Sequence, residues 1–302
     1  MKKIILLLLL TLALSAKTIT PNDVYSQVAL IRDKVHFLLK YYDITHDHEG
    51  IMKRGNIRSK LKPRNTWQVT YEIMIKINIL REKYKLPLIE PVNMEPVLNL
   101  NPDAVYEQTQ RILTELNIFE VRKGIKVPVF KEKQFKDKTP VDVFNGLSHI
   151  SASLDELSKG GVTPSFVFAE NMRLYDDITL ILNYLKIVDK TIPDKKDKQA
   201  TPKNTFEEGM KILEKIKHLQ ITAGIDFVDF DEFRKEKSTP SEVFGITQMI
   251  IAELQTIKAY IGLNTITPAA VRYKTKTPVE VNQLMSWNLR KLNLIHSLNK
   301  GR

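Results

Sequence analysis

The sequence contains no cysteine, and glycine is scarce, with 11 residues among 302. A chain without cysteine can form no disulfide framework, no thiolate metal site and no thiol nucleophile. Scarce glycine argues against sandwiches and barrels, which depend on many tight turns. A disordered chain is excluded as well, because 43% of the residues are hydrophobic. The sequence therefore predicts a folded, disulfide-free protein of roughly two domains.

Long hydrophobic runs are missing everywhere except at the N-terminus. There, two lysines precede an apolar run of about 13 residues, which is shorter than the roughly 20 needed to span a bilayer. The run ends in small residues at Ser15 and Ala16. This order of basic, apolar and small residues predicts a signal peptide over residues 1–16, removed on export. We therefore expect a periplasmic or secreted bacterial protein with no transmembrane segment in the mature chain.

Basic residues outnumber acidic ones, and the formal net charge at pH 7 is +11. A basic protein is usually expected to bind nucleic acid. Export makes that partner unexpected, so we predict that the protein binds no nucleic acid. Anionic lipid head groups, cell-wall polymers and acidic protein surfaces remain as partners that the net charge would attract.

A short phrase recurs along the chain, in which threonine and proline are followed, after two further residues, by valine and usually an aromatic residue. Threonine is a good N-cap, since its hydroxyl accepts a hydrogen bond from a free amide of the first turn. Proline fits the first helical position, where it loses no hydrogen bond. An acidic residue at the third position completes a capping box. Helix starts are predicted on this basis at Thr20, Asn65, Asn101, Thr139, Thr163, Asn204, Thr239 and Thr277.

The eight predicted helices form two sets of four, because each start in the first half has a counterpart roughly 140 residues later. Each helix carries an apolar seam with steps of three and four residues, as in helical bundles. The linkers within each half are long enough to let neighbouring helices run parallel. We therefore predict an all-α protein made by tandem duplication of a four-helix unit, with the units at residues 17–158 and 162–302.

Two sets of residues are candidates for ligand binding. Lysines gather in the linkers ahead of two helices, where they and the helix N-termini could hold an anion. The lysines of this predicted anion site are Lys131, Lys133, Lys136, Lys138, Lys274 and Lys276. The alternative is that they only keep exposed loops soluble. His46 and His48, with acidic neighbours, are candidate metal ligands, and the alternative for them is a solvated polar loop.

Catalytic and phosphate-binding motifs are absent: the sequence has no Gly-x-Ser-x-Gly, no His-Glu-x-x-His and no Walker loop. We therefore predict an exported, non-enzymatic helical binding or interaction protein without a cofactor. As a sensor-like or adaptor module, it would recognise an anionic envelope component or a protein partner. The alternative is a periplasmic enzyme with its site between the two helical units, where pockets often form.

Overall fold

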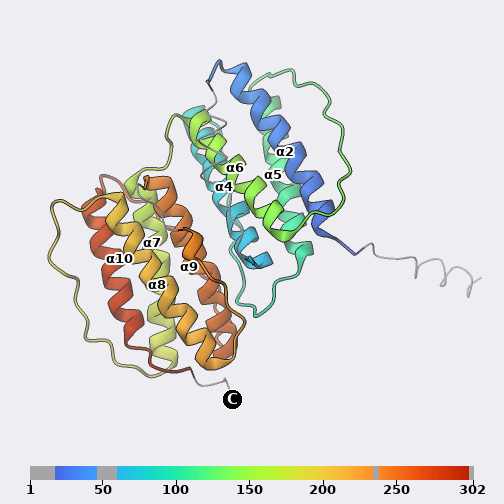
Figure 1. Cartoon of the computed structure of the whole chain (residues 1–302). Helices are drawn as coiled ribbons and strands as arrows, with labels where there is room; N and C mark the ends of the chain where they lie inside the picture. Colours follow the sequence, from blue (N-terminus) through green and yellow to red (C-terminus); the bar gives the residue numbers. More distant parts are fainter. Residues whose placement is uncertain (1–17, 46–59, 234–237, 299–302) are drawn as a thin grey trace, which may run out of the picture.

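The computed structural model describes residues 18–45, 60–233 and 238–298, and all regular secondary structure in these ranges is helical (Figure 1). The α-helices are α2 (Pro21–Tyr41), α4 (Pro63–Lys83), α5 (Pro102–Arg122), α6 (Pro140–Ser158), α7 (Pro164–Tyr184), α8 (Pro202–Ala223), α9 (Pro240–Ile261) and α10 (Pro278–Asn293). A short 3₁₀ helix, η1 (Asp231–Phe233), precedes α9. The prediction of an all-α protein is confirmed, whereas the predicted signal peptide over residues 1–16 lies outside the described residues.

Every α-helix begins with a proline in its first turn, preceded by an N-cap residue in extended conformation. At α6, the Thr139 hydroxyl accepts a hydrogen bond from the Asp142 amide (3.3 Å), and the Asp142 carboxylate accepts one from the Thr139 amide (2.8 Å). The same capping box joins Thr239 to Glu242 at the start of α9. Contacts over only three residues therefore set the start of these helices, as the sequence predicted.

Two helices start earlier than predicted. α4 begins at Pro63, so Asn65 is its third residue and not its N-cap. α8 begins at Pro202, and Asn204 is likewise its third residue. Each asparagine side chain accepts a hydrogen bond from the amide of the true N-cap, at 3.0 and 2.9 Å. Asparagine thus takes the place that Asp or Glu holds in the other capping boxes.

The helices form two groups of four (Figure 1). In the first group, α2 and α4 each pack against both α5 and α6. In the second group, α7 and α8 each pack against both α9 and α10. The neighbours are therefore the same in both groups when the helices are matched in chain order, which is the arrangement expected of a tandem repeat. The duplication itself stays a prediction.

The four helices of the second group run parallel, with their first turns at the same end. Their N-terminal prolines surround one small depression, together with the valine or threonine three residues further along each helix. In the first group, Lys34 of α2 pairs with Glu120 of α5. Lys76 of α4 pairs with Asp155 of α6. Both partners of each pair lie in the second half of their helices, so these neighbours are parallel too. Long linkers bring the chain back from the end of one helix to the start of the next (Figure 1).

A tight turn and several contacts between helices join the two groups. After α6 the chain turns at Lys159 and Gly160, which have positive φ values of 60° and 85°. Helix α4 then packs antiparallel to α9 of the second group. Arg64, in the first turn of α4, binds Glu253 in the second half of α9. Both helices are buried along most of their length, and no α-helix in the described ranges is long and apolar enough to cross a membrane.

Candidate functional site

A cavity of about 550 Å³ lies where the two groups of helices meet, and we call it the inter-group cavity. Its volume falls within the roughly 300–1,000 Å³ typical of small-molecule sites. Helix α4 forms one wall and the first two turns of α7 form a second. The linker segments 88–93 and 269–275 form the remaining walls. Both groups and two linkers are therefore needed to build it.

One stripe of α4 lines the inter-group cavity. Its residues Tyr71, Ile75, Asn78 and Glu82 are three or four positions apart, so they share a face of the helix. Asn78 also fixes the neighbouring linker at Ile89. The Asn78 side-chain amide donates to the Ile89 carbonyl at 2.7 Å, and its oxygen accepts from the Ile89 amide at 2.8 Å. These two bonds hold segment 88–93 against α4.

The closed end of the cavity is built around Arg173 of α7, whose side chain is buried. Its Nε donates to the Pro268 carbonyl at 2.7 Å, and another nitrogen donates to Asn93 at 2.8 Å. A third nitrogen binds the Glu170 carboxylate at 2.5 Å. The guanidinium also lies 4.8 Å from the centre of the Tyr71 ring. This Arg173 cluster (Arg173, Glu170, Tyr71, Asn93 and the Pro268 carbonyl) ties all four walls together.

Three side chains of the Arg173 cluster line the cavity: Glu170, Tyr71 and Asn93. Glu170 and Tyr71 are 2% and 3% exposed, and both line the space. One carboxylate oxygen of Glu170 binds Arg173, while the other has only a long 3.4 Å contact with the Tyr71 hydroxyl. Burial, followed by the charge of Glu170, raises the pKa of Tyr71 well above its usual value, so its hydroxyl remains protonated. The closed end therefore offers a carboxylate oxygen with unused capacity to accept a hydrogen bond.

The middle and the mouth of the cavity differ from its closed end. Apolar side chains of Ile75, Phe166 and Ala169 line the helical walls between the two ends. At the mouth, Arg272 and Glu82 form an ion pair of 3.0 Å, in which both side chains are more than half exposed. An exposed pair of this kind contributes only about 0–1 kcal/mol to stability. The surface of the cavity is thus predominantly apolar, although Asn78, Thr163 and Ser165 also line its helical walls, and it has a buried polar end and a weakly closed mouth.

The structure places the six predicted anion-binding lysines in different surroundings. Lys131 and Lys136 are exposed, and Lys133 pairs with Asp33 at 2.7 Å. Lys138 lies 4.5 Å from the centre of the Tyr25 ring.

The two lysines of the second group differ as well. Lys276 lies 4.3 Å from the centre of the Phe168 ring, and Lys274 lines the inter-group cavity. Among the six, only Lys274 reaches this space. His46 and His48 lie outside the described residues, within which no group of three or more metal-ligating side chains occurs.

Sequence reasoning missed Tyr71, Glu170 and Arg173. Glu170 and Arg173 are three residues apart on a helix, a spacing that usually marks a surface ion pair. Nothing in the sequence links them to Tyr71 or Asn93, which are 99 residues from Glu170 and 80 residues from Arg173, respectively. The one available signal was that this ion pair lies beside the apolar seam of α7.

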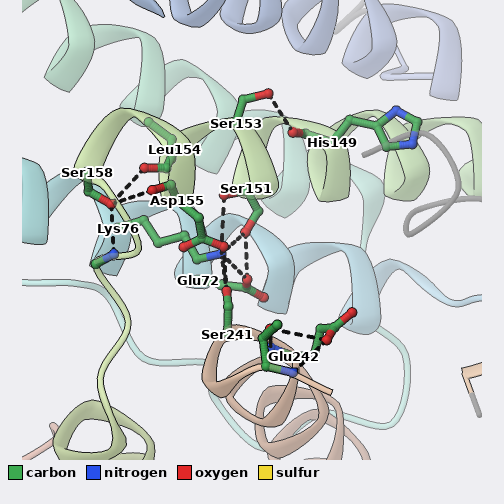
Figure 2. Close-up of polar contacts among 12 residues, drawn as sticks. Glu72, Lys76, His149, Ser151, Ser153, Leu154, Asp155, Ser158, Ser241 and Glu242 are labelled. Carbon is green, nitrogen blue, oxygen red and sulfur yellow. Dashed lines mark hydrogen bonds and ion pairs between the residues drawn. The ribbon is translucent and has the colours of Figure 1, made fainter. Parts of the chain in front are cut away.

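A second polar cluster lies between α4, α6 and α9, and it contains the residue types of a hydrolytic site (Figure 2). Ser151 donates to Glu72 at 2.6 Å, and the Lys76 ammonium donates to Ser151 at 2.7 Å. Lys76 also binds Asp155 at 2.8 Å and Ser241 at 2.7 Å. Figure 2 shows these side chains converging on the Lys76 nitrogen.

The protonation state of this second cluster indicates a structural role, in which its hydrogen bonds hold helices together. Burial alone lowers the pKa of Lys76, but the charges of Glu72 and Asp155 outweigh burial and raise the pKa above its usual value. A protonated ammonium cannot accept the proton of Ser151, so it cannot activate this serine as a nucleophile. The cluster instead fixes α4 against α6 and the start of α9, and so it holds one wall of the inter-group cavity in place.

Comparison with known proteins gives no family for this chain. No protein-family model, no curated protein and no solved structure matches it.

Proposed function

We propose that this protein is an exported, non-enzymatic binding protein whose ligand occupies the inter-group cavity. The observation that carries the proposal is the cavity of about 550 Å³, which has apolar walls and a buried polar end. Small-molecule sites typically combine such walls with a few fixed polar groups. The ligand would be taken up outside the cytoplasm, as the signal peptide over residues 1–16 implies.

A periplasmic enzyme with its site between the two groups is the alternative, and it has less support. The cavity does lie where that enzyme site was expected. In the described ranges, however, serine, lysine and carboxylate groups come together in the second polar cluster, around Lys76. There the lysine is a charged hydrogen-bond donor. At the cavity itself, Glu170 is engaged by Arg173. Binding therefore uses the observed geometry more fully than catalysis does.

An anionic envelope component is a second candidate partner, and it would bind at the basic linkers. Lys133, Lys138 and Lys276 already contact Asp33 or an aromatic ring. The carboxylate of Asp33 offsets the charge of Lys133, and the ring contacts fix where the ammonium groups of Lys138 and Lys276 lie. Lys274, at the cavity, is the predicted lysine best placed to meet a ligand.

We further infer that the two groups arose by tandem duplication. Lys34 of α2 pairs with Glu120 of α5 at 2.7 Å, and Asp177 of α7 pairs with Lys258 of α9 at 2.8 Å. The first partner of each pair lies 13 residues after the first residue of its helix, and the second lies 18 residues after it. In each group, a buried ion pair therefore joins the first and third helices at equivalent positions. The lysine is on the first helix in one group and on the third helix in the other.

The cavity side chains are not repeated in the first group. Counted from the first residue of each helix, Gln27 and Leu30 of α2 occupy the positions that Glu170 and Arg173 occupy in α7. Leu30 cannot make the hydrogen bonds of Arg173. If the groups are repeats, the Glu170–Arg173 pair is a feature of the second group alone, and the first group forms without an equivalent pair at these positions.

Filling the cavity tests the proposed function. The parent protein should bind Nile red, an uncharged apolar dye whose fluorescence rises in apolar surroundings. Ala270→Trp, on a linker wall of the cavity, should weaken dye binding by about tenfold or more, because the indole occupies the ligand space. Fluorescence titration measures both affinities.

The matched control for this test is Ala223→Trp. Ala223 is the last residue of α8 and does not line the cavity, so its replacement should leave dye binding unchanged. Absence of dye binding by the parent, or equal binding by Ala270→Trp, would refute the proposal.

A further inference from the structure

Building on the proposed function, we infer that the inter-group cavity binds an uncharged amphiphile: an apolar molecule with one hydroxyl or amide N–H group that donates a hydrogen bond to Glu170. The polar head lies at the closed end and the apolar body lies between α4 and α7. This assignment follows from the acceptor at the closed end, from the charge balance there and from the walls between the two ends.

The acceptor is the Glu170 oxygen that Arg173 does not bind. Its nearest donor is the Tyr71 hydroxyl at 3.4 Å, which is long for an O–H···O hydrogen bond. A carboxylate oxygen can accept two hydrogen bonds, so this buried oxygen retains unused capacity toward the cavity. A ligand donor placed here would form a charge-assisted hydrogen bond, which is roughly twice as strong as a neutral one.

The charge balance at the closed end decides whether the ligand head carries a charge. Glu170 and Arg173 bind each other at 2.5 Å, and both are 2% exposed. An anionic head would meet the carboxylate of Glu170, whose repulsion is weakly screened in a buried site. A cationic head would leave the closed end with a net positive charge, in a place where the cost of burying a charge is high. A neutral donor satisfies Glu170 without either cost.

The walls between the two ends decide the body of the ligand. Ile75 of α4 faces the space together with Phe166 and Ala169 of α7. Burying an apolar chain against such side chains favours binding, because apolar surface is removed from water. Apart from Glu170, the charged side chains of the lining are all exposed, and two of them, Arg272 and Glu82, pair with each other at the mouth. The other two are Glu90 and Lys274. An apolar body therefore fits the length of the cavity.

A head-group series on the parent protein tests the inference. Decan-1-ol, decanoate and decylamine share one chain length and differ only in the head, which is neutral, anionic or cationic at pH 7. Each is used to displace Nile red from the full chain. We expect decan-1-ol to displace the dye at about tenfold lower concentration than either charged compound, since tenfold in affinity corresponds to one favourable polar contact.

A substitution at the acceptor makes the test specific. Glu170→Gln keeps the size of the side chain and removes its charge. It should reduce the advantage of decan-1-ol over decanoate by about fivefold or more, because the charge-assisted bond and the repulsion of the anion are lost together. Nile red is titrated into the variant first, so that each displacement is expressed relative to the dye affinity of the same protein. Glu207→Gln, at an exposed position of α8, is the matched control and should leave the series unchanged.

The outcomes separate this inference from the proposed function. Nile red binding with decanoate or decylamine as good as decan-1-ol, or an unchanged ranking in Glu170→Gln, would overturn the inference and leave the cavity a binding site. Absence of Nile red binding by the parent would overturn the proposed function itself. Circular dichroism checks that Glu170→Gln is folded, and if it is not, the series on the parent decides alone.

Discussion

Arg173 holds the closed end of the cavity with all three nitrogens of its guanidinium group. Each nitrogen binds a different segment: the linker at Pro268, the linker at Asn93, and Glu170 of its own helix. A planar guanidinium suits this task, because its donors point in several fixed directions at once. At the scale of single residues, the shape of the candidate site thus depends on one buried ion pair and its hydrogen bonds.

Removing the cation should therefore destabilise the protein. Arg173→Leu should lower the free energy of unfolding by about 3–5 kcal/mol, because it leaves the Glu170 carboxylate buried without its partner. Urea denaturation followed by circular dichroism measures this loss. Adding Glu170→Leu to the same chain should recover most of it, since an apolar pair leaves no unpaired charge in the interior.

The control for this prediction is a surface arginine. Arg290 pairs with Asp194 at the surface, where both side chains are close to half exposed. Arg290→Leu should change stability by less than about 1 kcal/mol. Equal stability of Arg173→Leu and the parent would show that the Arg173 cluster contributes nothing to the fold.

At the scale of the helices, short-range capping defines where each element begins. Most helices carry an acidic or amide side chain in the first turn that binds back to the N-cap residue. α7 differs, because its third residue is Phe166 and its N-cap Thr163 makes no side-chain capping bond. The same Thr-Pro phrase thus starts helices whose capping energies should differ.

This difference yields a test by alanine substitution. Thr139→Ala and Thr239→Ala should each lower the free energy of unfolding by about 0.5–2 kcal/mol, the usual loss for an N-cap. Thr163→Ala should cost less, because no capping bond is lost there. Thermal melts of the three variants and the parent give the comparison. A loss at Thr163 as large as at Thr139 and Thr239 would contradict the capping geometry.

At the scale of the whole molecule, a buried polar contact joins the two groups. Glu253 of α9 is 1% exposed, and Arg64 of α4 binds both of its oxygens at 2.9 and 3.0 Å. Asn65 of α4 and Gln220 of α8 each add a bond of 2.7 Å to the same carboxylate. One carboxylate thus links three helices from both groups, so the groups should unfold together.

The two tryptophans provide a direct test of joint unfolding. Trp67 lies in α4 of the first group and Trp287 in α10 of the second. Variants that keep one tryptophan and replace the other with phenylalanine should show coincident urea transitions by fluorescence. Arg64→Leu in each background should lower stability by about 3–5 kcal/mol, since it strips the buried Glu253 of its cation. Separate transitions without that substitution would show that the groups are independent.

The helices of the described ranges, and their number, can be predicted from local sequence alone. Helix starts depend on contacts over three or four residues, and these contacts can be read from Thr-Pro phrases and capping acids. The two predicted starts that were wrong, Asn65 and Asn204, lie only a few residues from the true N-caps and belong to the same capping boxes. Long linkers also indicated correctly that neighbouring helices could be parallel.

The candidate site, in contrast, could not be predicted from local sequence. The contact of α4 with α9, the course of segments 88–93 and 269–275, and the burial of Arg173 all depend on packing between distant parts of the chain. A spacing of three residues between Glu170 and Arg173 describes a surface pair and a buried pair equally well. What separates the two is whether other segments exclude water around them, and that is settled by long-range packing and not by local sequence.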